Sequence, residues 1–283
     1  MKNSQSVNSP ATENQKLRKV VGNISLIITT YNRDDALELV FLSILHQNWY
    51  PAEIIVADDG SSQTTRELIH KYQKKMPILL RHCWHEDQGF RAATIRNKAI
   101  VMATNDYIII IDGDMVLHKD FVNDHIRMAR PNVFVQGKRV LLGQHLTQQA
   151  IQHHQIKFNF FHSQIKNRLN TLRMPLLANW LWWWHTHPLH GIRSCNMAFW
   201  RKDAIFINGF NEEFIGWGRE DSEFVARLLH TGIKRFNFKF GATAYHLYHQ
   251  KLSNPAIVEN DRILAKTLQD KKVWCKKGIN QYL

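Results

Sequence analysis

The feature that most constrains the fold is a regular alternation of strand-like and helical patterns between residues 24 and 112. Short apolar runs, rich in Ile and Val, lie at 24–30, 53–59, 78–82 and 107–112. The segments between them, at 34–47, 64–74 and 92–103, are typical of helices. Strands joined in this way by helices form mostly parallel sheets. We therefore predict an α/β fold whose mostly parallel central sheet is flanked by helices.

Polar and acidic residues directly follow three of these four runs. The first run ends in Thr30-Tyr-Asn-Arg33, the second in Asp58-Asp59 and the fourth in Asp112-Gly113-Asp114. In open parallel sheets, ligands bind beyond the carboxyl ends of the strands. The sequence therefore predicts a ligand site at this edge of the sheet.

The alternation stops after about residue 140, and residues 145–190 are rich in His, Gln, Asn and Trp. Strand and helix patterns return at 196–200, 220–230, 234–240 and 242–246, with a glycine-rich loop at 209–218. We expect one domain over 23–250 with an insertion at 145–190. A disordered leader is expected at 1–22 and a basic helical tail at 251–283.

Composition narrows the class of protein without deciding its partner. The 283 residues are 44% hydrophobic and 22% charged, which excludes an intrinsically disordered chain. The formal net charge of +13 favours nucleic acid, phosphorylated substrates or an anionic membrane face. Three widely spaced cysteines give neither a disulfide framework nor a zinc pattern. No stretch is apolar enough to span a bilayer, so we expect a cytoplasmic protein, soluble or peripheral on the membrane.

Two pairs of residues are candidate metal ligands. Asp112 and Asp114 stand two residues apart after a buried strand, so both can reach one hard cation that bridges a diphosphate. His246 and His249 follow a later strand, and either can complete the metal shell. The alternatives are an Asp-rich turn and two ordinary surface histidines.

Residues at the first two strand ends are candidates for binding a nucleotide. Thr30, Asn32 and Arg33 offer polar and cationic groups to a base, ribose or phosphate. Asp58 or Asp59 can accept hydrogen bonds from a ribose hydroxyl or a uracil N–H. The alternatives are an ordinary strand-to-helix loop and helix capping by Asp59 or Ser61.

The string Gln88-Gly-Phe-Arg91, followed by Arg96, places two arginines at the start of a helix. A helix N-terminus with two guanidinium groups suits a pyrophosphate. The alternative is a solvated basic helix end.

The string Gly216-Trp-Gly-Arg-Glu220-Asp221 is the most specific in the chain. Its glycines let the backbone present Trp217 as a platform for a sugar ring. Glu220 and Asp221 open a helix, where carboxylates ionise easily, and one of them can be a general base for an acceptor hydroxyl. The alternative is that Asp221 caps the helix and Trp217 belongs to the core.

Together these strings resemble family 2 glycosyltransferases with a GT-A fold. They are most similar to the branch with bacterial chondroitin-type polymerase domains and the β-1,4-galactosyltransferase-like C-terminal module. The matching strings occur in the family's order over about residues 23–250: 27–33, 56–61, 88–91, 96–97, 111–114, 196–199, 209–214, 216–221 and His246 with His249.

The resemblance implies an inverting transferase that uses a UDP-sugar and Mn²⁺ or Mg²⁺. It implies a nucleotide-binding half at 23–140 and an acceptor half at 191–250. The roles it implies are nucleotide-sugar binding by Thr30, Asn32, Arg33, Asp58, Asp59, Gln88, Arg91, Arg96, Asp112, Gly113 and Trp217; metal binding by Asp112, Asp114, His246 and His249; and catalysis by Asp221 as base with Glu220 at the acceptor.

The donor sugar is expected to be of galactose, N-acetylgalactosamine or glucose type. The acceptor is expected to be a glycan or glycolipid in bacterial surface polysaccharide or lipooligosaccharide synthesis. Arg219 departs from the family, which often has Gly there. Within the insertion, Arg168, Arg173 and residues 180–184 can lie on an anionic membrane or cover an acceptor lipid. The alternative is that the insertion packs its tryptophans into its own core.

Two other functions are open on the sequence alone. A non-catalytic protein that binds glycans or nucleic acid fits the charge and the aromatic content. It does not explain acidic pairs at successive strand ends, which would repel phosphate without a metal, so no nucleic acid is expected. A nucleotide-sugar pyrophosphorylase would need a glycine-rich basic loop near the first strand, and residues 29–35 do not provide one.

Overall fold

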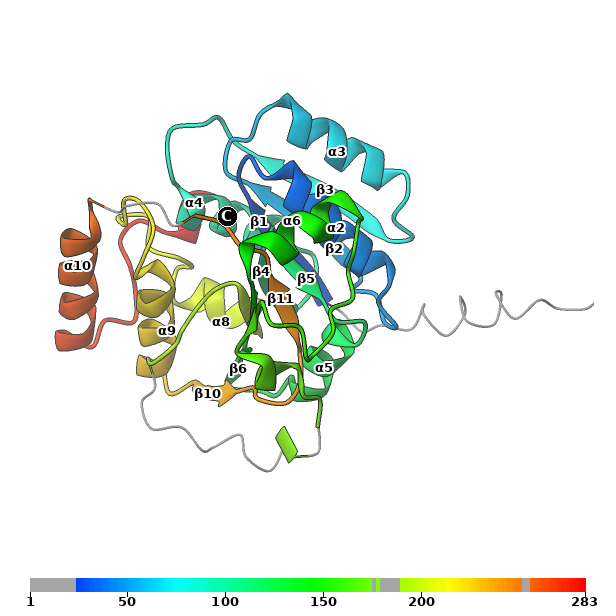
Figure 1. The fold of residues 1–283 in the computed structure, drawn as a ribbon. Helices are drawn as coiled ribbons and strands as arrows, with labels where there is room; N and C mark the ends of the chain where they lie inside the picture. Colours follow the sequence, from blue (N-terminus) through cyan, green and yellow to red (C-terminus); the bar gives the residue numbers. More distant parts are fainter. Residues whose placement is uncertain (1–23, 175–176, 179–188, 251–254) are drawn as a thin grey trace, which may run out of the picture.

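Seven strands form the central sheet in the computed structural model, which describes residues 24–174, 177–178, 189–250 and 255–283 (Figure 1). Their order across the sheet is β10-β6-β9-β4-β1-β2-β3. The strands are β1 (Ile24–Thr30), β2 (Glu53–Asp58), β3 (Leu79–Trp84), β4 (Tyr107–Asp112), β6 (Val133–Gln136), β9 (Asn196–Trp200) and β10 (Lys234–Asn237). The disordered leader predicted at 1–22 lies outside the described residues.

The centre of this sheet is parallel, as the strand–helix alternation predicts. β4, β1, β2 and β3 run in one direction, and β9 runs antiparallel to its neighbours β4 and β6. Every residue of β2 is buried, and β4 is buried up to its last residue. Strands covered on both faces need apolar side chains on both, which explains their near-continuous runs of Ile and Val.

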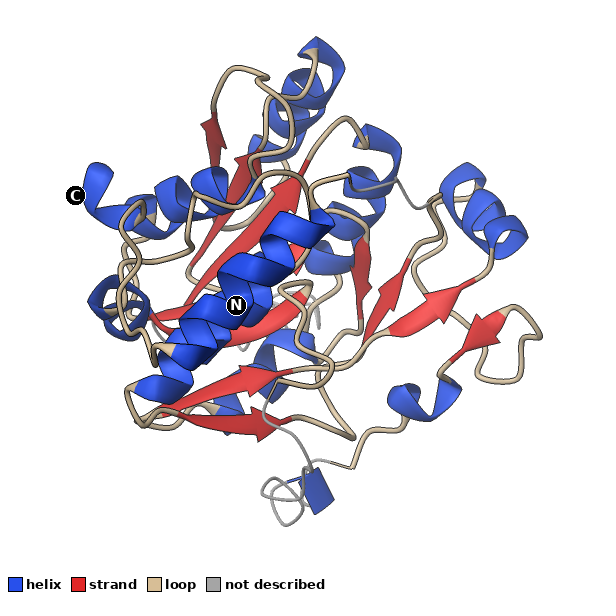
Figure 2. Cartoon of the chain, turned by 90° about the vertical axis from the view of Figure 1, so that its left-hand side faces the viewer, coloured by secondary structure: helices blue, strands red, loops and turns tan. Residues whose placement is uncertain are grey.

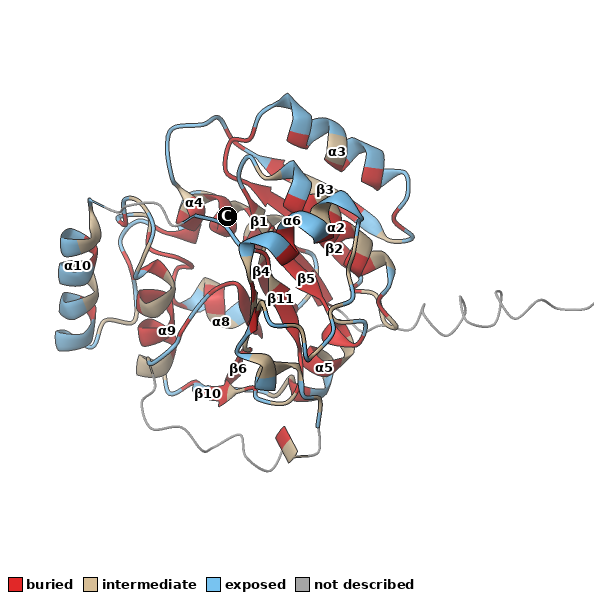
Figure 3. Cartoon of the chain, viewed as in Figure 1, coloured by how far each residue is buried: buried red, intermediate tan, exposed pale blue. Residues whose placement is uncertain are grey.

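Helices cover both faces of the sheet (Figure 2). Alternate residues of a strand point to opposite faces, so Leu26 and Ile28 join one apolar cluster while Ile27 joins the other. The first cluster includes residues of α2 (Asp34–Leu45), α3 (Gln63–Gln73) and α5 (Phe121–Met128). The second includes residues of α4 (Ala92–Met102), α8 (Arg201–Phe206) and α9 (Glu220–His230). Buried residues accordingly concentrate in the strands, and the outer sides of the helices are exposed (Figure 3).

A second sheet of four strands lies beside the first, in the order β5-β11-β7-β8. Its strands are β5 (Met115–Leu117), β7 (Val140–Leu142), β8 (Ile165–Lys166) and β11 (Ala244–His246). A third apolar cluster packs this second sheet against α2 and α6 (Gln144–Gln152). Helix α6 lies in the predicted insertion. The first part of the insertion therefore belongs to the fold of the domain.

The remaining insertion residues bear on the predicted membrane contact. After β8 comes the 3-10 helix η1 (Arg168–Thr171), and residues 180–184 with their tryptophans lie outside the described residues. Arg173 binds the carboxylate of Asp124, which is fully buried, at 2.7 Å and reaches Asp120 at 3.4 Å. The prediction that Arg173 lies on a membrane is therefore wrong, because its guanidinium neutralises an internal carboxylate.

The predicted tail contains α10 (Ile257–Gln269) and the 3-10 helix η2 (Ile279–Gln281). α10 lies beside α9 at the edge of the molecule, and the C-terminus returns to α4 (Figure 1). Ile279 is fully buried, and its N–H donates to the carbonyl of Asn208. The three cysteines are free thiols, each buried. Among the described residues, no helix is long and apolar enough to cross a bilayer.

Candidate active site

The ends of β4, β1 and β2 meet at one edge of the sheet. In the parallel register Asp112 lies opposite Thr29, and Thr30 lies opposite Asp58. The N–H of Gly113 then donates to the carbonyl of Thr29 at 2.7 Å. A Cβ on Gly113 would stand 2.8 Å from Thr30 Oγ1, so only glycine permits this close approach. Thr30 Oγ1 is buried without a hydrogen-bond partner beside this turn.

Asp114, His246 and His249 form a candidate metal site. One carboxylate oxygen of Asp114 lies 3.5 Å from Nε2 of His246 and 3.6 Å from Nε2 of His249. One potential ligand atom from each residue lies within 4.8 Å of the others. The pairing of β11 with β5 sets this geometry, because His246 lies opposite Met115 and the N–H of Leu247 donates to the carbonyl of Asp114.

The chemistry of these three groups fits a divalent cation. Asp114 Oδ1 is buried without a hydrogen-bond partner, and burial raises the pKa of its carboxyl group. Burial, helped by the positive charge of Arg139, lowers the pKa of His246 to about 4, so its imidazole is neutral at pH 7 and able to ligate. A buried carboxylate oxygen beside two imidazoles is a donor set that Mn²⁺ or a similar ion satisfies.

Asp112 stands outside this cluster and contacts an arginine instead. Its carboxylate lies 3.5 Å from Nη2 of Arg96, and Nη1 of the same guanidinium lies 3.4 Å from Glu220. Arg96 also donates to Thr29 Oγ1 and is only 4% exposed. Arg96 therefore joins Asp112 at the end of β4 to Glu220 at the start of α9, rather than lying open to a pyrophosphate as the helix-end pattern predicts.

Glu220 and Asp221 differ in their surroundings although they are adjacent. Glu220 is buried, and its Oε2 accepts the N–H of Gly218 at 2.8 Å. Burial, together with the negative charge of Glu220, raises the pKa of Asp221 to about 7, although the charge of Arg96 opposes this rise. A carboxylate with a pKa near neutrality can accept a proton and release it, as a general base must.

The loop before these carboxylates exposes an aromatic ring. Gly216 and Gly218 have φ angles of 68° and 106°, which suit glycine, and Arg219 has the left-handed φ of 78°. Between the glycines, the Trp217 side chain is 41% exposed. The sequence alternative of a core tryptophan is therefore wrong, and the ring is accessible for stacking against a sugar.

Asn32 and Arg33 sit in the loop that follows β1. Asn32 has the left-handed φ of 46°, accepts the N–H of Ser62 through its side chain and donates its own N–H to Ser61 Oγ. Arg33 pairs with Asp35 at 3.0 Å at the start of α2. These contacts tie the β1 and β2 loops together.

Asp58 and Asp59 have protein partners in this structure. Burial alone would raise the pKa of Asp58, but hydrogen bonds from His82 and Ser61 outweigh it and lower the pKa. Asp59 contacts Nε2 of His85 at 2.7 Å and accepts the N–H of Arg91. Both carboxylates therefore hold the strand-end loops in place, and a direct contact to a nucleotide stays a prediction.

The loop 86–91 places the two remaining predicted residues. The guanidinium of Arg91 donates to the carbonyl of Glu86, and Gln88 is exposed. Asp87 in this loop accepts the hydroxyl of Tyr31 at 2.8 Å, which raises the pKa of the phenol. Arg91 thus shapes its own loop beside the β1 end, and its contact to a pyrophosphate stays a prediction.

Sequence reasoning missed several residues around the site. Arg139 follows β6 and adds positive charge near Asp114 and His246, and Tyr31 is 47% exposed beside the β1 end. Only the basic pair of Arg139 with the preceding lysine could have drawn attention to it.

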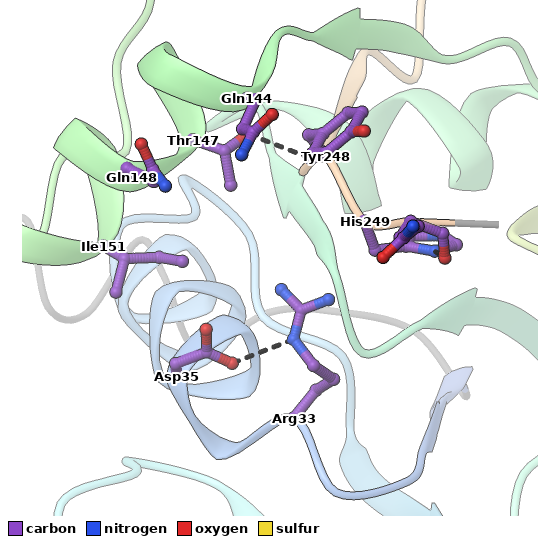
Figure 4. A pocket seen from close by; sticks show the side chains of 9 residues that line it. Arg33, Asp35, Gln144, Thr147, Gln148, Ile151, Tyr248 and His249 are labelled. Atoms are coloured by element: carbon purple, nitrogen blue, oxygen red, sulfur yellow. Dashed lines mark hydrogen bonds and ion pairs between the residues drawn. The ribbon is translucent and has the colours of Figure 1, made fainter. Parts of the chain in front are cut away.

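A pocket of about 480 Å³ borders the metal site (Figure 4). Arg33 points from the start of α2 into the space between α6 and the segment of Tyr248 and His249. The hydroxyl of Thr147 accepts the N–H of Tyr248, so α6 supports the chain that carries His249. The predicted insertion therefore contributes one wall beside the metal site, which the sequence pattern did not reveal.

The chain is similar to known proteins over most of its length. The profile of Glycosyl transferase family 2 matches residues 25–184, and the profile described as the N-terminal domain of galactosyltransferase matches residues 183–250. The chondroitin synthase of Escherichia coli is 25% identical over 269 residues, which cover 88% of this chain and 38% of that protein. The hyaluronan synthase of Pasteurella multocida is 27% identical over 238 residues, covering 79% of this chain and 24% of that protein.

A glucosyltransferase and two solved structures are also similar to this chain. A validoxylamine A glucosyltransferase of Streptomyces hygroscopicus is 26% identical over 74% of this chain and 48% of its own length. S. aureus TarS superposes with a TM-score of 0.60 at 16% identity, over 92% of this chain and 41% of that chain. The mannosyltransferase PcManGT of Pyrobaculum calidifontis, solved with GDP-Man and Mn²⁺, superposes with a TM-score of 0.56 at 18% identity. The match covers 85% of this chain and 64% of that chain.

The chain spans between about a quarter and a half of the length of these curated relatives. The two profiles meet near residue 184 and together cover both sides of the predicted site. The fold is the GT-A fold of the solved neighbours, as predicted. Because the first profile alone covers more than half of the 283 residues, the chain belongs to the family 2 glycosyltransferases.

Proposed function

We propose that the protein is an inverting, metal-dependent glycosyltransferase that transfers a hexose from a UDP-sugar to a hydroxyl group of a glycan or lipid-linked glycan. One observation carries the proposal. The Asp114–His246–His249 cluster and the carboxylates of Glu220 and Asp221 flank the same strand ends, and Arg96 bridges them through Asp112.

Asp114, His246 and His249 would hold the cation, which we propose to be Mn²⁺ or Mg²⁺. A divalent ion bound there would offset the negative charge of the departing diphosphate. The two imidazoles favour Mn²⁺ over Mg²⁺, because Mg²⁺ prefers oxygen ligands. Asp112 pairs with Arg96 and is not part of the three-residue cluster, so we propose that it supports the metal site without being a principal ligand.

Asp221 would act as the general base. As the acceptor oxygen forms its bond to the anomeric carbon, the bond from that carbon to the diphosphate oxygen breaks, and the hydroxyl proton passes to Asp221. A single displacement inverts the configuration, so no covalent sugar–enzyme bond is needed. Glu220, held by Gly218 and Arg96, would bind the acceptor beside the base, and Trp217 would stack on a sugar face.

The donor would bind across the β1 and β2 loops. Thr30 Oγ1 is buried without a hydrogen-bond partner at the β1 end, and Tyr31, whose residue is exposed, Asn32 and Arg33 follow it in the loop. Two solved structures of S. aureus TarS contain UDP and UDP-GlcNAc, which supports UDP as the carrier. We propose galactose, N-acetylgalactosamine or glucose as the sugar, with N-acetylglucosamine as the further candidate.

We also propose a pathway and a location. The named relatives include synthases of chondroitin and hyaluronan, which supports a role in bacterial surface polysaccharide or lipooligosaccharide synthesis. The net charge of +13 supports association with an anionic inner membrane face. Arg173 does not contribute to that association, because it pairs with Asp124.

UDP release from a panel of UDP-sugars tests the proposal. The panel is UDP-galactose, UDP-N-acetylgalactosamine, UDP-glucose and UDP-N-acetylglucosamine, each with Mn²⁺ and with EDTA. We expect release from at least one donor, abolished by EDTA and by Asp114→Ala. The matched control is Asp106→Ala, because Asp106 is exposed at the opposite end of β4.

Equal release with EDTA and Mn²⁺ would reject the metal-dependent function. Failure of all four donors to release UDP would reject the proposed donor class. A chain that releases no UDP yet binds glycans with Asp114 replaced would instead support the non-catalytic binding protein.

A further inference from the structure

The C-terminal helix α10 lies beyond residue 250, where both family profiles have ended. It packs beside α9, the helix that begins with Glu220 and Asp221 (Figure 1). Its two buried residues, Asn260 and Thr267, are both polar. Thr267 follows Asn260 at position i+7, so the two residues lie on one face of the helix. α10 is therefore held by specific hydrogen bonds more than by apolar burial.

Asn260 binds the backbone of the loop that carries Trp217. Its side-chain amide donates to the carbonyl of Ile215 at 3.0 Å and to the carbonyl of Gly218 at 3.1 Å. Asn260 is 1% exposed, so water does not compete for these bonds. One buried side chain thus fixes both ends of the segment 215–218.

The contact at Gly218 continues to the carboxylates. The carbonyl of Gly218 accepts from Asn260 while its N–H donates to Glu220 Oε2 at 2.8 Å. The other oxygen of Glu220 faces Arg96, which pairs with Asp112. The peptide of Gly218 therefore connects α10 to the acidic residues on both sides of the candidate site.

A second, exposed contact joins the same elements. The guanidinium of Arg219 binds Asp261 at 2.5 Å, with side-chain exposures of 47% and 51%. An ion pair so exposed contributes little by itself. It does stand beside Asn260 on α10, and it restrains a residue whose φ of 78° is costly for a non-glycine residue. Asn260 is therefore the stronger of the two links.

We propose that Asn260 of α10 is a positioning residue for glycosyl transfer. It holds the loop 215–219 so that Glu220 and Trp217 meet the substrate in one geometry. The proposal rests on the proposed function for its catalytic consequence, but the restraint of the loop is a property of the free protein.

The test compares Asn260→Ala with Thr267→Val. Asn260→Ala removes both hydrogen bonds to the loop. Thr267→Val removes one buried hydrogen bond of α10, to Glu223 Oε1, which lies on α9 beyond the loop. We expect Asn260→Ala to lower kcat about 100-fold, the scale of a displacement of about 1 Å. Its affinity for UDP with Mn²⁺ should stay unchanged. Thr267→Val should keep kcat within about threefold.

Hydrogen exchange of residues 215–220 in the free protein gives a readout that does not need turnover. We expect faster exchange there in Asn260→Ala than in Thr267→Val, because the loop loses its buried restraint. If the wild type released no UDP, the proposed function would fail while this measurement still decided the positioning role.

Three results would overturn the proposal: unchanged exchange at 215–220 in Asn260→Ala, retention of its kcat, or an equal loss of kcat in both variants. The third would show that any weakening of α10 has the same effect. Should Asn260→Ala not fold, Asn260→Ser replaces the amide by a hydroxyl on a shorter side chain, and the same comparison with Thr267→Val applies to it.

Discussion

Replacing Asp221 by Asn should separate catalysis from stability. The amide keeps the shape of the carboxyl group but cannot accept a proton at neutral pH. We expect transfer to fall by about 10² to 10⁴, the contribution of a well-placed general base. UDP binding with Mn²⁺ should persist, because Asp221 is outside the Asp114–His246–His249 cluster.

The pKa of Asp221 sets the magnitude of the stability change. The pKa of Asp221 is about 7 in the folded protein, whereas the ordinary value for an aspartic acid is 3.8, a difference of about 3.2. At 1.36 kcal/mol per unit, ionising this carboxyl group costs the folded state at most about 4 kcal/mol. At pH values between these two pKa values the folded state binds more protons than the unfolded state. The free-energy cost of ionising Asp221 in the folded state therefore grows as the pH rises from about 4 to 7, and it is constant above pH 7.

Two measurements, one comparing the variant with the wild type and one on the wild type alone, check this reasoning. Urea denaturation should show Asp221→Asn close to wild type at pH 4 and more stable at pH 8. In the wild type, kcat/KM should fall about tenfold per pH unit below pH 7 as the base becomes protonated. A variant that retains transfer, or one whose stability relative to wild type does not change with pH, would refute the assignment.

Two further substitutions probe the framework of the site. Gly113→Ala places a Cβ 2.8 Å from Thr30 Oγ1, so we expect a loss of about 1–3 kcal/mol in urea denaturation and weaker UDP binding. Unchanged stability would show that the β4 turn is not tightly packed. Arg173→Met leaves the fully buried Asp124 without its cation, so unfolding should become easier by about 3–5 kcal/mol while kcat is preserved. A loss of turnover without a loss of stability would contradict a structural role for this pair.

The sequence predicted the parts of the fold that depend on local patterns. The runs ending in Thr30, Asp58 and Asp112 are rich in Ile and Val, so the sequence predicted their parallel pairing and their common edge. The short strands β5 and β7 have three residues each, too few for a periodic signal. Each pairs with β11 (Ala244–His246), which comes much later in the chain, and β7 also pairs with β8.

The same limit applies to the site. The candidate metal ligands Asp114, His246 and His249 were identified because each stands at a strand end. The ion pairs of Arg96 were not predicted, because its partners Asp112 and Glu220 are distant in sequence and neither indicates a buried ion pair. Asn260 gave no signal at all, because an asparagine within an amphipathic helix usually faces solvent.

The central claim is that Asp114 and the two histidines hold a cation that binds the departing nucleotide. Calorimetric titration of UDP into the protein, with Mn²⁺ and with EDTA, tests it most directly. We expect UDP binding that requires Mn²⁺ and weakens at least about tenfold, or about 1.4 kcal/mol, in Asp114→Ala. Equal UDP affinity with and without the metal, or an unchanged affinity in that variant, would contradict the claim.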